Sequence, residues 1–187
     1  MAVPAVQTWE WTADAFELAG ENGLFGDDAH AELIDGRVTV MSPQSPAHAY
    51  ALQVLLRALA GLGPQWTART QSPVRLANDT EPEPDICVAL GPYELYANRH
   101  PGPQDISLLI EVSSSSLGFD IGHKIPAYAR SSVPEVWVVD IAHRQVLMYS
   151  SPEPDQAVYA HVETRTSGTI TAYGLEVEVD RLWPASS

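Results

Sequence analysis

The sequence predicts an α/β (α+β) domain with a mixed central β-sheet flanked by helices. Helical and strand patterns follow one another in the order helix, hairpin, helix, strands, helix, strands. The segment "DISLLIEVSSSS" (105–116) also holds a continuous apolar run ended by serines, which is typical of a central strand covered on both faces. With 187 residues and no internal repeat, the chain is expected to form a single domain over residues 1–187.

Two helices are predicted in the N-terminal third of the chain. Thr12 can cap a short helix in residues 13–23, which ends near a glycine. The clearest helical pattern lies in residues 42–63, where apolar residues recur every three or four positions and two glycines close the segment. Ser45 can cap this second helix, and Pro46 suits its first turn.

Strand patterns occupy most of the remaining chain, and their order indicates a mixed sheet. The predicted segments are a hairpin at 31–42 around Asp35-Gly36, an alternating pair at 65–71 and 73–79, a short buried strand after a proline-stiffened acidic approach at 81–91, the apolar strand at 105–116, two strands at 134–150 joined near Ala142-His143, and a last strand with a closing segment at 172–184.

The charge of the chain limits how it could bind a nucleic acid. The formal net charge is −14, and a single lysine accompanies nine arginines. Proteins that bind nucleic acids over a broad surface normally neutralise phosphates with many basic side chains. Phosphate chemistry would therefore need a local site, a metal ion or both, while the excess of acid could equally serve solubility.

Composition also narrows the class of protein. Cys87 is the only cysteine, which excludes an internal disulfide and a cysteine-built zinc site, and its apolar neighbours predict a buried hydrophobic side chain. No apolar run is long enough to span a membrane, and the N-terminus has no signal-peptide pattern. We therefore expect a cytoplasmic protein with no membrane contact.

Acidic residues at the ends of predicted strands are the first candidates for chemistry. Glu111 follows three apolar residues, and the alternation of a strand places it on the same face as Leu109. If this face is buried, the Glu111 carboxylate must be paired, hydrogen-bonded or metal-bound. A glutamate that reaches solvent, or that pairs with an arginine, is the simpler alternative. Asp85 opens the buried strand at 81–91 but would also suit an ordinary Pro-Asp turn.

Four more polar residues stand near these acids in the predicted arrangement. Glu32 begins the hairpin, His48 lies at the edge of the second helix's apolar stripe, and Asp120 and Lys124 follow the serine-rich turn. Each residue also has a simpler explanation. The glutamate would suit a polar position in a hairpin, and the histidine would suit the boundary of a buried helix face. The aspartate would suit a helix cap, and the lysine would suit a solvated position on a helix. Because Pro126 would break a helix interior, the next helix is expected to begin close to Lys124.

Three segments together resemble the Uma-two family, whose members are assigned as bacterial nucleases. They are "ELIDGRVTVMSPQSPAH", "PEPDICV" and "LLIEVSSSSLGFDIGHKIPAYARSSVPEVWVVD", and the resemblance extends over residues 12–149. It implies a restriction-endonuclease-like core of the PD-(D/E)xK superfamily.

The resemblance also implies a set of site residues. Asp85 and Glu111 match the two motif acids, and Lys124 matches the motif lysine, which this family carries on the next helix. Ser113 occupies the position, two residues after the second acid, where the superfamily usually has its lysine. Further matching positions are Glu32, His48, Asp120 and Tyr128.

Such a set would suit phosphodiester hydrolysis with Mg²⁺ or Mn²⁺, because a bound divalent cation offsets phosphate charge and activates water. Mg²⁺ prefers oxygen ligands and keeps several waters. Asp85 and Glu111 are the expected metal ligands, with Glu32 as a third and the backbone carbonyl of Val112 as an added oxygen. Lys124 would orient the attacking water and neutralise phosphoryl oxygens, a task for which a compact ammonium differs from a broad guanidinium.

Three functions are compatible with these residues. The first is a metal-dependent endonuclease acting on DNA. The second is a binding or accessory protein on a nuclease-like scaffold without turnover, which the acidic charge favours. The third is an enzyme acting on RNA or small nucleotides, which needs no large basic surface. A homodimer would help to reconcile the charge with DNA binding if Arg69, Arg75 and Arg99 gather along one groove.

Overall fold

A computed structural model of the chain describes residues 9–26 and 30–184. The helices are α1 (Ala13–Glu21), α2 (Pro46–Leu59), α3 (Leu117–Phe119) and α4 (Ile125–Arg130). The strands are β1 (Ala31–Ile34), β2 (Arg37–Val40), β3 (Trp66–Thr70), β4 (Ile86–Leu90), β5 (Ile106–Ser113), β6 (Glu135–Asp140), β7 (Gln145–Glu153), β8 (Val158–Arg165), β9 (Thr169–Ala172) and β10 (Leu175–Glu178).

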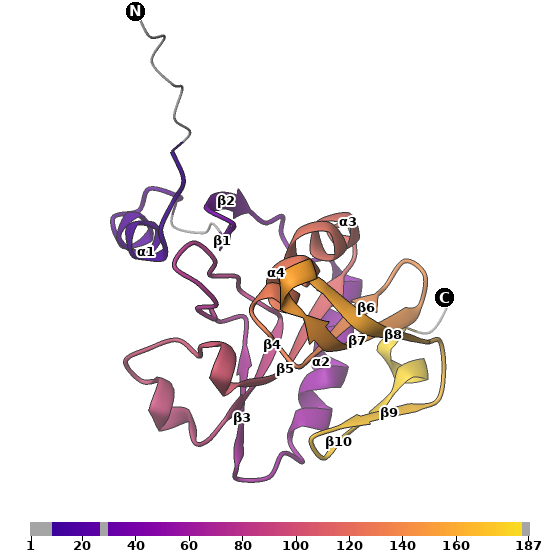
Figure 1. Cartoon of the computed structure of the whole chain (residues 1–187). Helices are drawn as coiled ribbons and strands as arrows, with labels where there is room; N and C mark the ends of the chain where they lie inside the picture. The colour runs from indigo at the N-terminus through magenta and orange to yellow at the C-terminus, as the bar shows by residue number, and fades with distance from the viewer. Residues whose placement is uncertain (1–8, 27–29, 185–187) are drawn as a thin grey trace, which may run out of the picture.

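The central element is a six-stranded sheet of order β3-β4-β5-β6-β7-β8. Strands β5 and β6 run parallel, whereas the other neighbouring pairs are antiparallel. The hairpins β1–β2 and β9–β10 form separate two-stranded sheets and lie apart, at opposite corners of the view in Figure 1. The mixed central sheet flanked by helices is the α+β architecture that the sequence predicts.

Strand β5 is buried along its whole length because side chains cover both faces of the sheet. Leu108, Ile110 and Val112 pack in a core that includes α2 and the β9–β10 hairpin. Leu109 packs on the opposite face in a core that includes α4. Since successive side chains of a strand alternate between faces, Glu111 falls on the α4 face.

The first two helices begin where their capping residues predict. The Thr12 hydroxyl accepts a hydrogen bond from the Ala15 N–H (3.3 Å), and the Ser45 hydroxyl accepts one from the His48 N–H (3.2 Å). Pro46 occupies the first turn of α2. Cys87 is fully buried in β4, as its apolar neighbours predict.

Residues 73–79 do not form the predicted strand, and β3 pairs with β4 instead. The segment folds back on the residues that follow it. The Val74 N–H donates to the Pro82 carbonyl (3.0 Å), and the Leu76 N–H donates to the Thr80 carbonyl (3.0 Å). The Asn-Asp pair between these partners favours a tight turn, so the backbone bonds are satisfied locally rather than in the sheet.

Helix α4 begins at Ile125, next to Lys124, as predicted, but a helical segment that was not predicted precedes it. This segment starts with α3, and a π-helical turn (Asp120–Lys124) joins α3 to α4. The Ile125 N–H donates to a carbonyl five residues back in the chain. This wider turn accommodates Pro126, which has no N–H to donate and whose ring would crowd the preceding turn of a regular α-helix. Lys124 therefore projects from within a helical segment and not from its first residue.

Strand β8 was not predicted, although it pairs with β7 along most of its length. Of its eight residues only Tyr159 is buried, so the segment has neither an apolar run nor a clear alternation. Strand β9 likewise precedes the last strand that was predicted. Both segments form strands because they pair with a neighbouring strand, and such pairing gives little signal in the local sequence.

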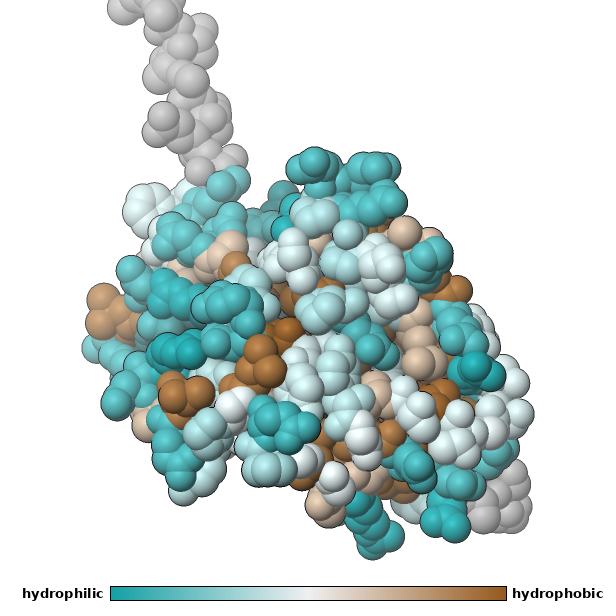
Figure 2. Space-filling model, turned by 60° about the horizontal axis from the view of Figure 1, so that its bottom comes forward, coloured by the Kyte–Doolittle hydropathy of each residue, from teal (hydrophilic) through white to brown (hydrophobic). Residues whose placement is uncertain are grey.

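Hydrophobic side chains on the surface shown in Figure 2 are scattered among hydrophilic ones. Isolated apolar residues of this kind are ordinary on folded proteins. None of the helices in the described residues has the length and apolar character needed to cross a membrane.

Replacing Leu55 in α2 by alanine tests the core between α2 and the sheet. Leu55 is 1% exposed, so Leu55→Ala is expected to lower the free energy of unfolding by about 2–5 kcal/mol. Urea unfolding at equilibrium measures the change. The matched control is Leu18→Ala in α1, where the side chain is 61% exposed and the expected change is within about 0.5 kcal/mol. Equal effects of the two variants would contradict the assignment of this core.

Candidate active site

A cavity of about 720 Å³ lies where Asp85, the residue before β4, meets the last residues of β5. Its walls come from the β1–β2 hairpin and the loop after it, the start of α2, and the serine-rich turn after β5. The predicted site residues that line it are Glu32, His48, Asp85, Glu111, Val112, Asp120 and Lys124. Ser113 and Tyr128 contact these residues from behind the wall.

Lys124 is 2% exposed and holds two glutamates that lie far apart in the sequence. Its Nζ donates to Glu32 Oε1 at 2.9 Å and to Glu111 Oε2 at 3.1 Å. The Oδ1 atom of Asp120 lies 3.9 Å from the same ammonium. One cation therefore joins β1, β5 and the π-helical turn.

The carboxyl groups around Lys124 outnumber the single positive charge that could neutralise them. Burial raises the pKa of Glu111 well above its ordinary value and also raises the pKa of Glu32, although Lys124 opposes both shifts. Burial opposes the charged form of Lys124, but Glu111, Glu32 and Asp120 outweigh it and raise the pKa of Lys124. The ammonium is thus charged at neutral pH, and it faces three buried carboxyl groups.

Hydroxyl groups orient two of these carboxyl groups. The Tyr128 hydroxyl donates to Glu111 Oε1 from α4. The hydroxyls of Ser113 and Ser116 each donate to Asp120 Oδ2 at 2.7 Å. Ser113 shares the α4 face of β5 with Glu111, since the two residues are two positions apart. It thus helps to fix Asp120 beside the ammonium.

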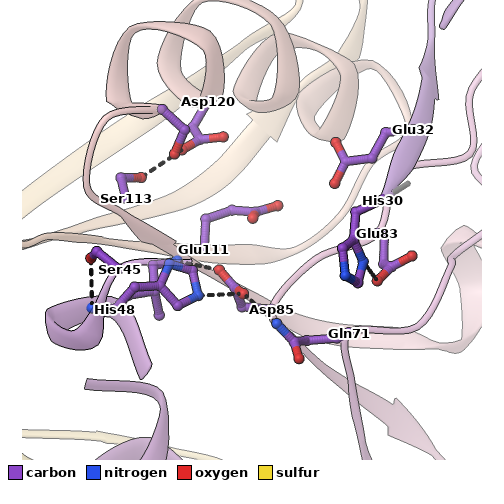
Figure 3. A network of polar contacts seen from close by, with 12 residues as sticks. His30, Glu32, Ser45, His48, Gln71, Glu83, Asp85, Glu111, Ser113 and Asp120 are labelled. Atoms are coloured by element: carbon purple, nitrogen blue, oxygen red, sulfur yellow. Dashed lines mark hydrogen bonds and ion pairs between the residues drawn. The ribbon is translucent and has the colours of Figure 1, made fainter. Parts of the chain in front are cut away.

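Asp85 is fixed by contacts on both of its oxygens. Oδ1 lies 2.9 Å from His48 Nε2 and 3.4 Å from Gln71 Nε2. Oδ2 accepts the backbone N–H of Val112 at 2.8 Å. The carbonyl of a strand residue faces the same neighbour as its N–H, so the Val112 carbonyl is directed to the Asp85 side of β5. Figure 3 shows the carboxylates of Glu32, Asp85, Glu111 and Asp120 directed from different elements toward one space.

The donor types around this cavity are those that a hard divalent cation such as Mg²⁺ prefers, although carboxylate oxygens of Glu32, Asp85 and Glu111 do not all lie within 4.8 Å of one another. The cavity offers carboxylate oxygens and a strand carbonyl, and Mg²⁺ needs one or two carboxylates because it keeps several waters. Glu32 Oε2 is buried and receives no hydrogen bond from any residue that the structure describes. A buried carboxylate oxygen without a donor is costly, and a cation or its water would satisfy it.

Sequence reasoning missed four polar residues of this site. Gln71 and Ser116 donate to Asp85 and Asp120, and His30 Nδ1 lies 3.5 Å from Glu83 Oε1 in the cavity wall. The alternation of acids and prolines in "EPEPD" (81–85) could have indicated Glu83. Gln71 carries no such signal, because it reaches Asp85 only through the pairing of β3 with β4.

Arg69, Arg75 and Arg99 do gather at one place, as the prediction of a DNA-binding groove requires. They line a second cavity of about 690 Å³. Acidic residues share its wall, however, and the guanidinium groups of Arg75 and Arg99 are already paired with carboxylates. The second cavity is therefore of mixed charge and not a basic groove.

Comparisons with known proteins show the family and the fold of the chain. The family model of Uma2, described as "Putative restriction endonuclease", matches residues 13–180. The chain is also similar to the crystal structure of a "putative nuclease belonging to DUF820" from Anabaena variabilis ATCC 29413, with a TM-score of 0.58 and 14% sequence identity over 82% of this chain and 89% of that one. At this identity the structural match establishes the fold alone. No curated protein matches the chain.

Replacing Lys124 by methionine tests whether the ammonium stabilises the buried acids. Lys124→Met is expected to lower the free energy of unfolding by about 3–5 kcal/mol at pH 7, because buried carboxylates lose their cation. Without the ammonium, the pKa values of Glu111 and Glu32 lie still further above their unfolded values. The native state then needs protons that are scarce at high pH, so the deficit should grow from pH 5 to pH 8.

Tyr128→Phe is the control for this measurement, because it removes one hydrogen bond to Glu111 and no charge. It should cost about 1–3 kcal/mol. Urea unfolding curves at several pH values compare the two variants with the original chain. A Lys124→Met variant with unchanged stability across this pH range would rule out the proposed electrostatic role.

Proposed function

Because the chain belongs to the Uma2 family, we propose that it is a divalent-metal-dependent endonuclease that hydrolyses phosphodiester bonds in DNA. The observation that carries the proposal is the convergence of Asp85, Glu111 and Lys124 on one cavity. Two acids supply oxygen ligands and the lysine supplies a fixed positive charge. This combination suits the stabilisation of a pentavalent phosphoryl group, which gains negative charge during attack by water.

Asp85 and Glu111 are the metal ligands that we propose, with the free oxygen of Glu32 and the carbonyl of Val112 as further donors. Mg²⁺ or Mn²⁺ bound there would offset phosphate charge and lower the pKa of a coordinated water. His48 and the Val112 N–H hold the Asp85 carboxylate in place, and Tyr128 holds Glu111. These contacts keep the ligands in position before a metal arrives, which reduces the cost of binding.

Lys124 acts in this proposal through its charge and not as a base. Its pKa is raised by the surrounding acids despite burial, so the ammonium keeps its proton at neutral pH. From the cavity wall it can donate to a phosphoryl oxygen or to the attacking water. An ammonium at this position would also moderate the negative charge of the carboxylates, which would otherwise repel a phosphate.

The acidic surface favours a substrate that is bound locally. The net charge of −14 gives little long-range attraction to DNA, so the metal ion and Lys124 would supply most of the attraction for the scissile phosphate. Hydroxyl and imidazole donors in the cavity wall, such as Ser114, Ser115 and His30, can contact flanking phosphates. A homodimer that presents two such cavities to one duplex stays a prediction.

The proposal predicts cleavage of supercoiled plasmid DNA in Mg²⁺ or Mn²⁺ and none in EDTA. Asp85→Asn should reduce the cleavage rate by about 1,000-fold, because metal assistance supplies several kcal/mol and about 1.4 kcal/mol corresponds to a tenfold change. Asp155→Asn, which changes an exposed aspartate far from the cavity in sequence, is the matched control and should cleave like the original chain.

A panel of plasmid DNA, single-stranded oligonucleotides and RNA decides the substrate in the same experiment. Metal-dependent cleavage of RNA alone would change the proposed substrate from DNA to RNA and leave the proposed reaction, phosphodiester hydrolysis, unchanged. Equal cleavage by Asp85→Asn, or no metal-dependent cleavage of any member of the panel, would refute the enzyme and favour a binding protein on a nuclease-like scaffold.

Lys124→Arg tests why a lysine stands at this position. A guanidinium is broad and planar, and a site shaped for an ammonium between two glutamates does not admit it without displacement. We expect single-turnover cleavage to fall by about 100-fold or more, as for the loss of one transition-state donor. Arg130→Lys in α4 is the converse control at an exposed ion pair and should cleave normally. Circular dichroism and thermal unfolding confirm that both variants fold; full activity of folded Lys124→Arg would end the catalytic assignment.

A further inference from the structure

Three potential metal ligands meet in the second cavity, outside the candidate active site. Glu17 comes from α1, Glu81 from the segment before β4, and His100 from the loop before β5. One ligand atom of each residue lies within 4.8 Å of the others. Among the residues that the structure describes, this is the only group of three or more histidine, cysteine, aspartate or glutamate side chains whose ligand atoms lie so close together.

Glu81 is the most deeply buried residue of this group. It is 3% exposed, and its Oε2 atom receives no hydrogen bond from the described part of the chain. Arg75 Nε lies 4.0 Å from this oxygen, which is beyond hydrogen-bond distance. The Nδ1 atom of His100 is also buried and has no hydrogen-bond partner within residues 9–26 and 30–184. Two residues that line the second cavity therefore each have a buried polar atom without a hydrogen-bond partner in the described part of the chain.

The backbone holds these ligands in place. Glu81 exchanges two backbone hydrogen bonds with Leu33 of β1, at 2.7 and 3.2 Å. Helix α1 is anchored by its buried residues Ala13 and Phe16, and the Ala13 N–H donates to the Asn78 carbonyl at 2.6 Å. The three ligands are thus positioned by packing that does not itself require an ion, which favours binding.

The cluster places two carboxyl groups and an imidazole beside one guanidinium. Burial raises the pKa of Glu81 to about 8, and the charge of the neighbouring Glu17 carboxylate and a hydrogen bond between the two side chains act in the same direction. Burial and the Arg69 guanidinium lower the pKa of His100. Arg75 offsets part of the negative charge, but its guanidinium is shared with Asp14 and Glu17.

We propose that Glu17, Glu81 and His100 bind a divalent transition-metal ion, for which Zn²⁺ is the probe. An imidazole nitrogen with two carboxylate oxygens is a ligand set that suits Zn²⁺ better than Mg²⁺, which prefers oxygen alone. Water from the cavity would complete the coordination. Because the ligands come from three separate segments, the ion would fasten α1 to the body of the protein and raise its stability.

Isothermal titration of the untagged, chelator-treated full chain with ZnCl₂ tests this site. His100→Ala and Glu81→Gln are each expected to weaken Zn²⁺ binding by more than about tenfold. His161→Ala, which removes an exposed histidine from β8, is the matched control and should bind like the original chain. Asp85→Asn should also keep this binding, since it changes only the candidate active site.

Thermal unfolding gives a second readout. Excess ZnCl₂ should raise the melting temperature of the original chain and of Asp85→Asn, and the rise should be lost in Glu81→Gln. Unchanged Zn²⁺ binding in Glu81→Gln would mean that Zn²⁺ binds without Glu81, and would overturn the proposal. Loss of binding in Asp85→Asn alone, or equal losses in His100→Ala and His161→Ala, would overturn it as well. Cleavage of DNA in Mg²⁺ should survive His100→Ala, so the two proposals fail independently.

Discussion

The ammonium of Lys124 is the contact on which the arrangement of the candidate active site depends. It holds Glu32 of β1 and Glu111 of β5, and it lies beside Asp120 of the helical segment that follows β5. Three buried carboxyl groups around one cation cannot all be ionised without a large cost, because their mutual repulsion is poorly screened in the interior. The hairpin, the sheet and the helical segment are thereby held together by a cluster that remains short of positive charge.

The π-helical turn explains how a lysine outside the strand can serve the strand's glutamate. In the superfamily that the sequence resembles, the motif lysine usually stands two residues after the acid. Ser113 holds that position here, and its hydroxyl donates to Asp120 instead. The widened turn before Pro126 brings Lys124 from the helical segment back over Glu111. A helix residue thus supplies the charge, while the strand residue fixes a neighbour of that charge.

The local sequence was sufficient for much of the fold and for the main residues of the site. Apolar periodicity and capping residues predict α2, and the apolar run predicts β5 with Glu111 on a buried face. The misassigned segment 73–79 and the unpredicted β8 both depended on which strand pairs with which, a choice made by tertiary packing. Gln71 was missed for the same reason. The start of α4 at Ile125 was predicted from Pro126, whereas the π-helical turn before it was not, because the proline forbids a regular α-helix there but not a wider turn.

The acidity of the chain acquires a more specific meaning when the two cavities are considered together. Residues 81–85 alternate acids with prolines, and this segment connects the cavities: Glu81 lines the second, Asp85 lines the first, and Glu83 lines both. Pro82 and Pro84 cannot donate hydrogen bonds and restrict the backbone, so the spacing of the three acids is held firmly. Acids held at fixed spacing in cavity walls are unsuited to attracting DNA from a distance, but they are suited to holding cations. Eight of the 24 acidic residues line the two cavities, where they would serve to concentrate the positive charge that a phosphate needs.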